Sequence, residues 1–200
     1  MDNYQKLAMA NLCHVWRAPP PDLADRLGGM PAAGGVNLQA FGRQWVIDRD
    51  GVRAVDGYTG SVEALLISIY ARHGQAAPMQ AEPFAAFKEL PGSAPYAGAF
   101  ARHAQQSLAP YVAAMAKRLD VLCAALDGVA ADRAAAGDFA FTVRPLPKIA
   151  LQYICYVADD EFPASVTCLF SRNAPVFMPT DALADVGEYT AKSIIHLLGK

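Results

Sequence analysis

Thiol and imidazole side chains, the usual protein ligands of zinc and of iron–sulfur clusters, are widely spaced in this sequence. Cys13 and His14 form the only adjacent pair. Neighbouring side chains on a helix point about 100° apart, so these two cannot chelate one ion together. The other cysteines, Cys123, Cys155 and Cys168, form no Cys-x-x-Cys motif. We therefore expect free thiols and no metal-ligating residues.

The acidic residues near the C-terminus are a second candidate for chemistry. Asp181, Asp185 and Glu188 recur at the i, i+4, i+7 spacing and so share one face of a helix. Apolar residues occupy the opposite face, and Lys192 follows Glu188 by four residues, which favours a surface ion pair. We expect this face, which also holds His196, to be solvated and not to bind a metal ion.

Sequence signatures of common enzymes are missing. The chain contains no His-Glu-x-x-His motif and no Gly-x-Ser-x-Gly nucleophile elbow. Residues 28–35 are rich in glycine but match neither phosphate-binding pattern, and no strand pattern leads into them. We expect this segment to be a flexible connector.

Three loop segments remain as candidates for binding. They cover residues 87–93, residues 144–147, and residues 160–165 together with 172–173. Each combines proline with charged side chains beside an expected sheet edge, and binding groups are commonly carried by loops on a rigid scaffold. The alternative is that the prolines shape corners and the charges solvate them. The candidate ligand-binding residues are Phe87, Glu89, Arg144, Glu161, Arg172 and Asn173.

The elements that must position these loops follow from periodicity and turn residues. We expect a single α+β domain with a mixed or antiparallel sheet, an N-terminal meander, a helical middle and a C-terminal covering helix. Helices are expected to begin at the capping residues Asn3, Ser61, Ser107 and Thr180, the first stopped by the prolines at 19–21, the second by Gly74 and the third by Gly128. Strands are expected at 36–41, 44–48, 52–55, 84–88, 139–143, 149–157 and 164–170. We divide the chain into an N-terminal segment, 1–35, and an α+β domain, 36–200.

The last two expected strands can be aligned with each other. If their turn is centred on residues 160–161, Tyr153 lies opposite Cys168, and Cys155 lies opposite Val166. Both thiols then share one face as diagonal neighbours, too far apart for an easy disulfide. Free thiols at this spacing indicate a reducing compartment.

Composition and charge limit the classes of protein to which this chain can belong. The chain has 200 residues, 54% of them hydrophobic, and a net charge of −2. These values indicate a globular domain and exclude the clustered basic surface of a nucleic-acid or anionic-membrane binder. No apolar run reaches the roughly 18 residues of a membrane span, and the first residues lack the pattern of a secretory signal. We expect a cytoplasmic protein without nucleic-acid or membrane partners.

The same loop segments carry a family resemblance. Phe-Lys-Glu-Leu-Pro-Gly at 87–92, Arg-Pro-Leu-Pro at 144–147, Asp-Glu-Phe-Pro-Ala-Ser at 160–165 and Met-Pro-Thr-Asp-Ala-Leu-Ala at 178–184 resemble the Domain of Unknown Function 3786 family, from about residue 36 onward. The resemblance implies an uncharacterised protein of anaerobic bacteria or archaea. Some members are joined to cysteine-rich iron–sulfur segments of the kind found with corrinoid proteins. This chain lacks such a four-cysteine motif, and the family supplies no catalytic residues.

Three functional hypotheses follow. The first is a non-catalytic binding or accessory protein that holds a small molecule or a protein partner, linked by the resemblance to anaerobic redox or corrinoid metabolism. The second is an enzyme that acts on a small anionic substrate, with an arginine clamp and Glu161 as acid or base. The third is an interaction-only subunit or homodimer. The sequence leaves the cofactor, the ligand and the oligomeric state unknown.

Overall fold

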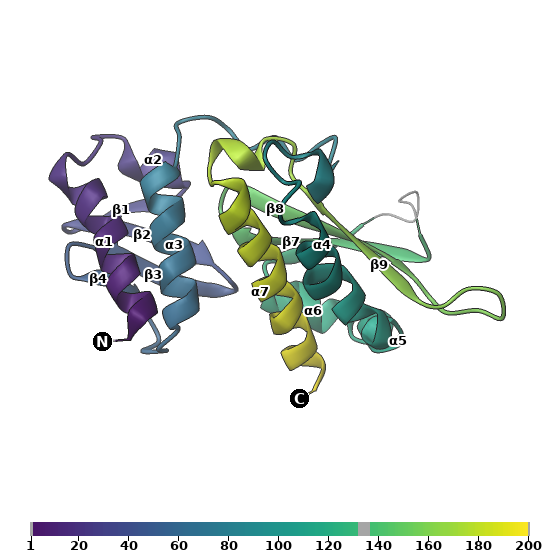
Figure 1. Ribbon diagram of the computed structural model, residues 1–200. Coiled ribbons are helices and arrows are strands. Elements are labelled where there is room, and N and C mark those ends of the chain that lie inside the picture. Colours follow the sequence, from purple (N-terminus) through teal and green to yellow (C-terminus); the bar gives the residue numbers. More distant parts are fainter. Residues whose placement is uncertain (1, 132–136, 200) are drawn as a thin grey trace.

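The computed structural model describes residues 2–131 and 137–199 (Figure 1). It contains two antiparallel β-sheets with helices packed against them. One sheet is built from residues 30–54, and the other from residues 85–86 and 128–170. A meander, a helical middle and a C-terminal helix follow one another as expected, so the α+β class with a single domain is confirmed.

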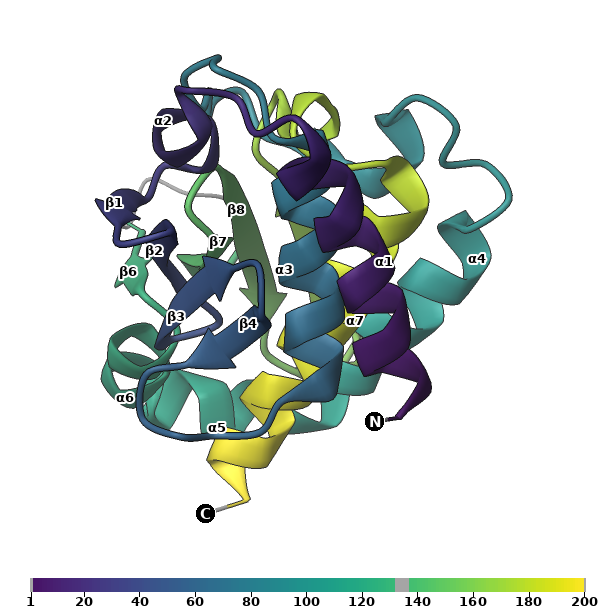
Figure 2. The same ribbon diagram turned by 90° about the vertical axis from the view of Figure 1, so that its left-hand side faces the viewer.

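The N-terminal sheet is a four-stranded meander flanked by helices. Its strands, in spatial order, are β1 (Met30–Ala32), β2 (Gly35–Ala40), β3 (Arg43–Asp48) and β4 (Gly51–Ala54). The helices are α1 (Asn3–Arg17), α2 (Leu23–Leu27) and α3 (Ser61–His73). Helices α1 and α3 lie side by side next to this sheet (Figure 2). The indole Nε1 of Trp16 donates a hydrogen bond of 2.7 Å to the carbonyl of Asp48, which ties α1 to β3.

The expected connector at residues 28–35 is partly a strand. Met30 pairs with Asn37 and Ala32 pairs with Gly35, so β1 adds a fourth strand to the meander. The proline at position 31 suits an edge strand, because proline has no amide hydrogen to donate to a neighbour. The division of the chain at residue 35 stays a prediction.

The turn between β2 and β3 lies one residue earlier than the sequence suggested. Ala40 pairs with Arg43, so Phe41 and Gly42 are the two turn residues, whereas Gly42 and Arg43 were expected. Their φ angles are 49° and 73°, and a two-residue hairpin of this type needs positive φ at both positions. Phenylalanine rarely adopts such a backbone, which explains the error.

The C-terminal sheet has five strands, in the order β5-β9-β8-β7-β6. Their bounds are β5 (Ala85–Ala86), β6 (Gly128–Ala130), β7 (Phe139–Leu146), β8 (Ile149–Tyr156) and β9 (Ser165–Phe170). The expected alignment is confirmed, because Tyr153 pairs with Cys168 and Cys155 pairs with Val166. The two thiols are buried and free.

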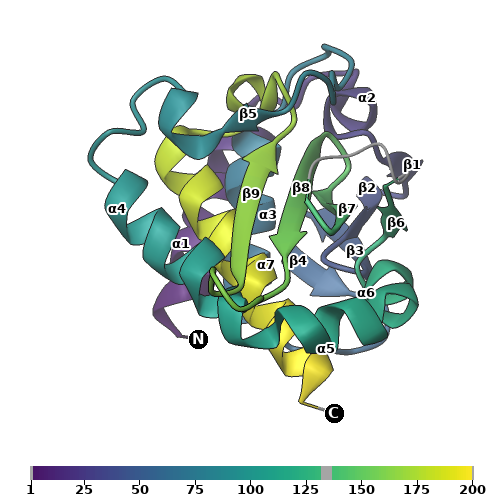
Figure 3. The same ribbon diagram turned by 90° about the vertical axis from the view of Figure 1, so that its right-hand side faces the viewer.

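Helices from the middle and the end of the chain pack over this sheet (Figure 3). They are α4 (Ala97–Phe100), a π-helical turn (Ala101–Gln105), a 3₁₀ helix (Gln106–Tyr111), α5 (Val112–Lys117), α6 (Leu119–Ala125) and α7 (Thr180–Leu198). The expectation of one continuous helix over residues 107–127 was wrong. Pro110 has no amide hydrogen for a helical bond, and the chain breaks again at Arg118 between α5 and α6.

The buried core spans both halves of the molecule. An aromatic cluster of Phe87, Phe100 and Phe170 packs under α7, with Phe87 and Phe100 stacked at 4.3 Å between ring centroids. The two sheets are joined where the amide of Phe41 donates a hydrogen bond of 2.8 Å to the carbonyl of Pro145. Within residues 2–131 and 137–199, no helix has the length and apolarity needed to cross a membrane.

Candidate functional site

Four of the six residues predicted from the sequence lie along the β5–β9 edge. Phe87 is buried in the aromatic cluster, and the Oε2 atom of Glu89 accepts a hydrogen bond of 3.2 Å from the amide of Ala86. Asn173 donates to the carbonyl of Pro78 at 2.9 Å and accepts from the amide of Gln80 at 2.8 Å.

These contacts show what the four residues do within the fold. Phe87 fills the core, Glu89 caps a short turn, and Asn173 fastens the loop that leads into β5. The side chain of Arg172 is exposed at the end of β9, where its backbone amide donates to the carbonyl of Ala81 at 3.2 Å. Their role in ligand binding stays a prediction.

Arg144 and Glu161 lie apart from each other. Arg144 is exposed near the end of β7 that pairs with Leu151, whereas Glu161 is exposed in the turn beyond Tyr156. Residues 151–156 of β8 separate these two levels, which corresponds to roughly 17 Å of strand. Arg172 follows Phe170, which also pairs with Leu151. Both arginines are therefore far from Glu161. A binding site shared by Glu161 and an arginine stays a prediction, and this arrangement does not favour it.

A cleft elsewhere in the molecule gathers polar and aromatic side chains that the sequence did not single out. It has a volume of about 960 Å³ and lies between the turns of the N-terminal sheet, the end of α6 and the last turns of α7. Ligand-binding clefts span roughly 300–1,000 Å³. We call it the tyrosine cleft; its lining includes Phe41, Arg43, Tyr58, Glu63, Tyr189 and Lys192.

Glu63 is a buried carboxylate that contributes to the lining of this cleft. It is the third residue of α3 and only 4% exposed. Gly60 leaves room for it, because a Cβ at that position would lie 2.4 Å from the Oε2 atom of Glu63. The positive end of the helix dipole, equivalent to about half a charge, offsets part of the negative charge. Glu63 makes no ion pair with any residue that the structure describes.

Two tyrosines accompany this carboxylate. The hydroxyl of Tyr189 on α7 donates a hydrogen bond to the Oε1 atom of Glu63. Burial and the neighbouring Glu63 carboxylate raise the pKa of Tyr189 well above its ordinary value, and the same two causes raise the pKa of Tyr58. Both side chains are therefore neutral phenols at physiological pH and serve as hydrogen-bond donors, not as bases.

Arg43 and Lys192, two cationic side chains of the cleft, already have partners. Arg43 forms an ion pair with Asp56, and its Cζ atom lies 4.2 Å from the ring centroid of Tyr58. The amide of Tyr58 donates to the Asp56 carboxylate at 3.1 Å. This hydrogen bond and the charge of Arg43 lower the pKa of Asp56.

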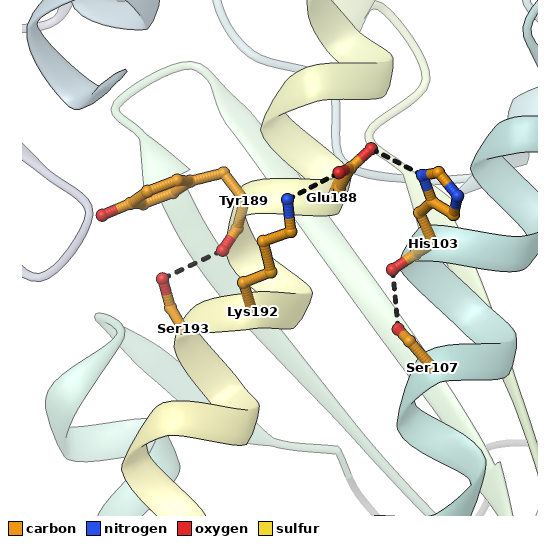
Figure 4. A network of polar contacts seen from close by, with 6 residues as sticks. All are labelled: His103, Ser107, Glu188, Tyr189, Lys192 and Ser193. Atoms are coloured by element: carbon orange, nitrogen blue, oxygen red, sulfur yellow. Dashed lines mark hydrogen bonds and ion pairs between the residues drawn. The ribbon is translucent and has the colours of Figure 1, made fainter. Parts of the chain in front are cut away.

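Lys192 belongs to a second group of polar contacts (Figure 4). Its ammonium donates to the Oε1 atom of Glu188 at 2.7 Å, and the Oε2 atom of Glu188 lies 3.1 Å from Nδ1 of His103. These partners lower the pKa of Glu188, with the Lys192 hydrogen bond as the main cause. One turn of α7 is also braced where the hydroxyl of Ser193 donates to the carbonyl of Tyr189 at 3.0 Å.

Phe41 contributes an aromatic ring to the lining of the cleft. Its ring meets the ring of Tyr189 edge to face, with 5.0 Å between centroids. A small apolar niche of about 10 Å³ adjoins the cleft and shares Phe41, Leu126 and Ser193 with it. The backbone of Phe41 adopts a rare positive φ, and such strain is frequent at functional sites.

The comparisons with known proteins identify a family. The sequence profile described as domain of unknown function (DUF3786) matches residues 19–193. The chain belongs to the DUF3786 family. Comparison of this DUF3786 chain with curated proteins and with solved structures finds no match. The profile begins before the first motif that carried the resemblance, so it includes α2 and β1.

One signal in the sequence could have pointed to the cleft. Glu63 interrupts the apolar stretch of residues 62–71, and a charged residue on the buried face of a helix is rarely retained without a partner or a function. The expected ion pair of Glu188 with Lys192 is present. However, Lys192 and His196 also line the cleft, because α7 passes the turns of the other sheet. These residues lie far apart in the sequence, so their spacing could not predict that they meet.

Proposed function

We propose that this DUF3786 domain is a non-catalytic binding protein and that its small-molecule ligand occupies the tyrosine cleft. The observation that carries the proposal is the buried Glu63 carboxylate, which contributes to the lining of a cleft of ligand size without a cationic partner among the described residues. Burial of an unpaired carboxylate costs several kcal/mol, roughly, in folding free energy. A site that binds ligand through this group explains its retention.

Further features support binding over catalysis. Two cationic groups of the cleft are engaged in Arg43–Asp56 and Lys192–Glu188 pairs, and the raised pKa of Tyr189 makes its hydroxyl a donor and not a base. The second hypothesis, an enzyme with Glu161 and an arginine, lacks this support because both arginines lie at the other end of the β8–β9 hairpin.

The location and partners are proposed on separate grounds. A net charge of −2 and free cysteines at positions 13, 123, 155 and 168 support a cytoplasmic protein that does not bind nucleic acid. A link to anaerobic redox or corrinoid metabolism rests on the family resemblance and not on any residue of the cleft.

Native mass spectrometry with four classes of small molecule tests the proposal: amines, carboxylates, phosphates and nucleosides. Ser193 lines the cleft, so Ser193→Trp places a bulky ring in it, whereas Ser165→Trp places the same side chain on the exposed start of β9. We expect one class to bind the natural protein and Ser165→Trp but not Ser193→Trp. Equal binding by both variants, or no binding by any class, overturns the proposal.

The sequence-predicted residues have their own experiment. Charge reversal by Arg144→Glu and Arg172→Glu changes exposed side chains outside the tyrosine cleft. If the ligand occupies the cleft, both variants keep its affinity within about twofold, as expected of distant surface charges. Loss of the ligand in either variant would place the site near the loops that the sequence indicated. A dimer that binds none of the four classes would favour the interaction-only hypothesis.

A further inference from the structure

The charges of the tyrosine cleft do not balance. Arg43 is neutralised by Asp56, and Lys192 is neutralised by Glu188. Glu63 has the neutral hydroxyl of Tyr189 as its hydrogen-bond donor and no cation among the described residues. An ionised carboxylate offers about four acceptor positions on its two oxygens, so the hydroxyls of Tyr189 and Tyr58 together still leave acceptor capacity unused. The chemical complement of this site is a cation with hydrogens to donate.

The surroundings of Glu63 are suited to an organic cation. The rings of Phe41, Tyr58 and Tyr189 contribute to the lining of the cleft beside it. The faces of aromatic rings attract cations within about 6 Å of the centroid. The guanidinium of Arg43 shows this attraction directly, because its Cζ atom lies 4.2 Å from the centroid of Tyr58. A carboxylate together with aromatic rings is a combination that recognises ammonium groups.

A metal ion fits the same residues less well. In residues 2–131 and 137–199, no group of three or more His, Cys, Asp or Glu side chains is placed to hold a metal ion. The raised pKa values of Tyr58 and Tyr189 keep both phenols protonated, and a protonated phenol is a poor ligand. The cation is therefore organic.

The apolar part of the cleft lining indicates what the cation carries. Phe41, Val55, Leu126 and Leu197 contribute apolar side chains to the cleft. Burial of a methylene group contributes about 0.8 kcal/mol to binding, so an apolar tail that follows this wall adds affinity without a further polar contact. The adjoining niche of about 10 Å³ is too small for a methylene group, so a tail has room only in the cleft itself, along Phe41 and Leu126.

We propose that the ligand of the tyrosine cleft is a protonated primary amine with an apolar tail, and that its ammonium group donates to the carboxylate of Glu63. This inference rests on the proposed binding function and specifies the ligand class of the same cleft. The ammonium lies at Glu63 among the aromatic rings, and the tail lies along Phe41 and Leu126.

Three probes of equal length and different charge test this assignment: hexylammonium, hexanoate and 1-hexanol. Their dissociation constants are measured by NMR titration of the full chain. We expect hexylammonium to bind about 10–100-fold more tightly than the other two, the range expected for a hydrogen bond to a charged group. Glu63→Gln keeps the shape and the acceptor for Tyr189 but removes the charge. This substitution should weaken the affinity for hexylammonium by the same factor and leave the affinity for 1-hexanol unchanged.

A matched control and the opposing outcomes complete the experiment. Glu82 is exposed and lies outside the cleft, so Glu82→Gln makes the same chemical change at a site that should not affect binding. If hexanoate or 1-hexanol binds best and Ser193→Trp abolishes that binding, the amine assignment fails while the binding function stands. If none of the three probes binds, and Ser193→Trp also leaves the binding of all four classes of small molecule unchanged, both proposals fail. Equal affinity of hexylammonium for Glu63→Gln and the natural protein overturns the amine assignment alone.

Discussion

The hydroxyl of Tyr189 on the last helix donates a hydrogen bond to the buried carboxylate of Glu63, which lies 126 residues earlier in α3. This contact joins the helix that covers the C-terminal sheet to a helix of the N-terminal sheet. Because Glu63 is only 4% exposed, little of its carboxylate contacts water, so solvent compensates only in part for the loss of the phenol donor. The same bond therefore holds the two halves of the molecule together and shapes the tyrosine cleft.

Removal of this donor should destabilise the protein. Tyr189→Phe keeps the ring against Phe41 but leaves the buried carboxylate without its hydroxyl partner. We expect the free energy of unfolding in urea to fall by about 1–3 kcal/mol. Tyr156→Phe removes an exposed hydroxyl on β8 and should change the free energy of unfolding by less than about 0.5 kcal/mol. Equal effects of the two substitutions would show that the bond to Glu63 contributes little.

Gly42 permits the close approach of the two halves. A Cβ at Gly42 would lie 2.0 Å from the carbonyl oxygen of Ala125 at the end of α6, and its φ is 73°. Gly34 has a nearly equal φ of 77°, but a Cβ there meets nothing within 4 Å. Gly34→Ala should therefore cost only the backbone strain, about 1–2 kcal/mol.

Gly42→Ala adds a steric clash to the same strain. We expect it to lower the free energy of unfolding by about 1–3 kcal/mol more than Gly34→Ala, the range found for overpacked sites. Urea denaturation of both variants measures the difference. Because Gly42 also lines the tyrosine cleft, NMR shifts of the cleft residues should change in Gly42→Ala alone. Similar losses in both variants would contradict the tight contact with α6.

Local patterns were sufficient to predict much of the fold. An apolar run over residues 149–157, a further strand over 164–170 and an acidic turn between them predicted a hairpin, and its alignment of Tyr153 with Cys168 is confirmed. The errors arose where a single residue overrides the pattern. Pro110 ends what apolar spacing presented as one helix, and Phe41 adopts a backbone that its residue type disfavours.

The cleft could not be predicted from such local patterns, for a physical reason. Its main groups, Arg43, Tyr58, Glu63 and Tyr189, come from three elements and one loop, and all except Glu63 are ordinary residues in their own segments. They converge because the turn at Phe41 docks on Pro145, a contact across more than one hundred residues. Periodicity describes which face of an element is buried but not which two elements meet. Glu63, as a charge within an apolar stretch, was the one local indication.

The buried cysteines should resist modification in the folded protein. Burial raises the pKa of Cys155 and of Cys168 from 9.0 to about 12, whereas Cys13 is exposed. The reactive thiolate population falls tenfold for each unit by which the pKa rises, so alkylation at pH 8 should be roughly 1,000-fold slower than for an ordinary thiol. Mass spectrometry after iodoacetamide treatment measures each site.

Unfolding provides the control for this labelling. In concentrated urea, all four cysteines should react at similar rates. The raised pKa values also predict that stability falls as the pH rises from about 9 towards 12, because the unfolded chain ionises first. Rapid labelling of Cys155 or Cys168 without urea would mean that the β8–β9 pair opens readily.

The contacts of Glu188 should make stability depend on pH in the acidic range. Lys192 and His103 lower the pKa of this carboxyl below its ordinary value of 4.5, so its contribution is fully present above about pH 4.5 and is lost as the pH falls through the folded value. Glu188→Gln removes that contribution, which for a partly exposed i, i+4 pair is about 0.3–1 kcal/mol at pH 6. Urea denaturation from pH 3 to pH 6 should therefore show curves for the natural protein and the variant that converge towards pH 3. A constant separation across this range would mean that Glu188 stabilises the fold through packing and not through its charge.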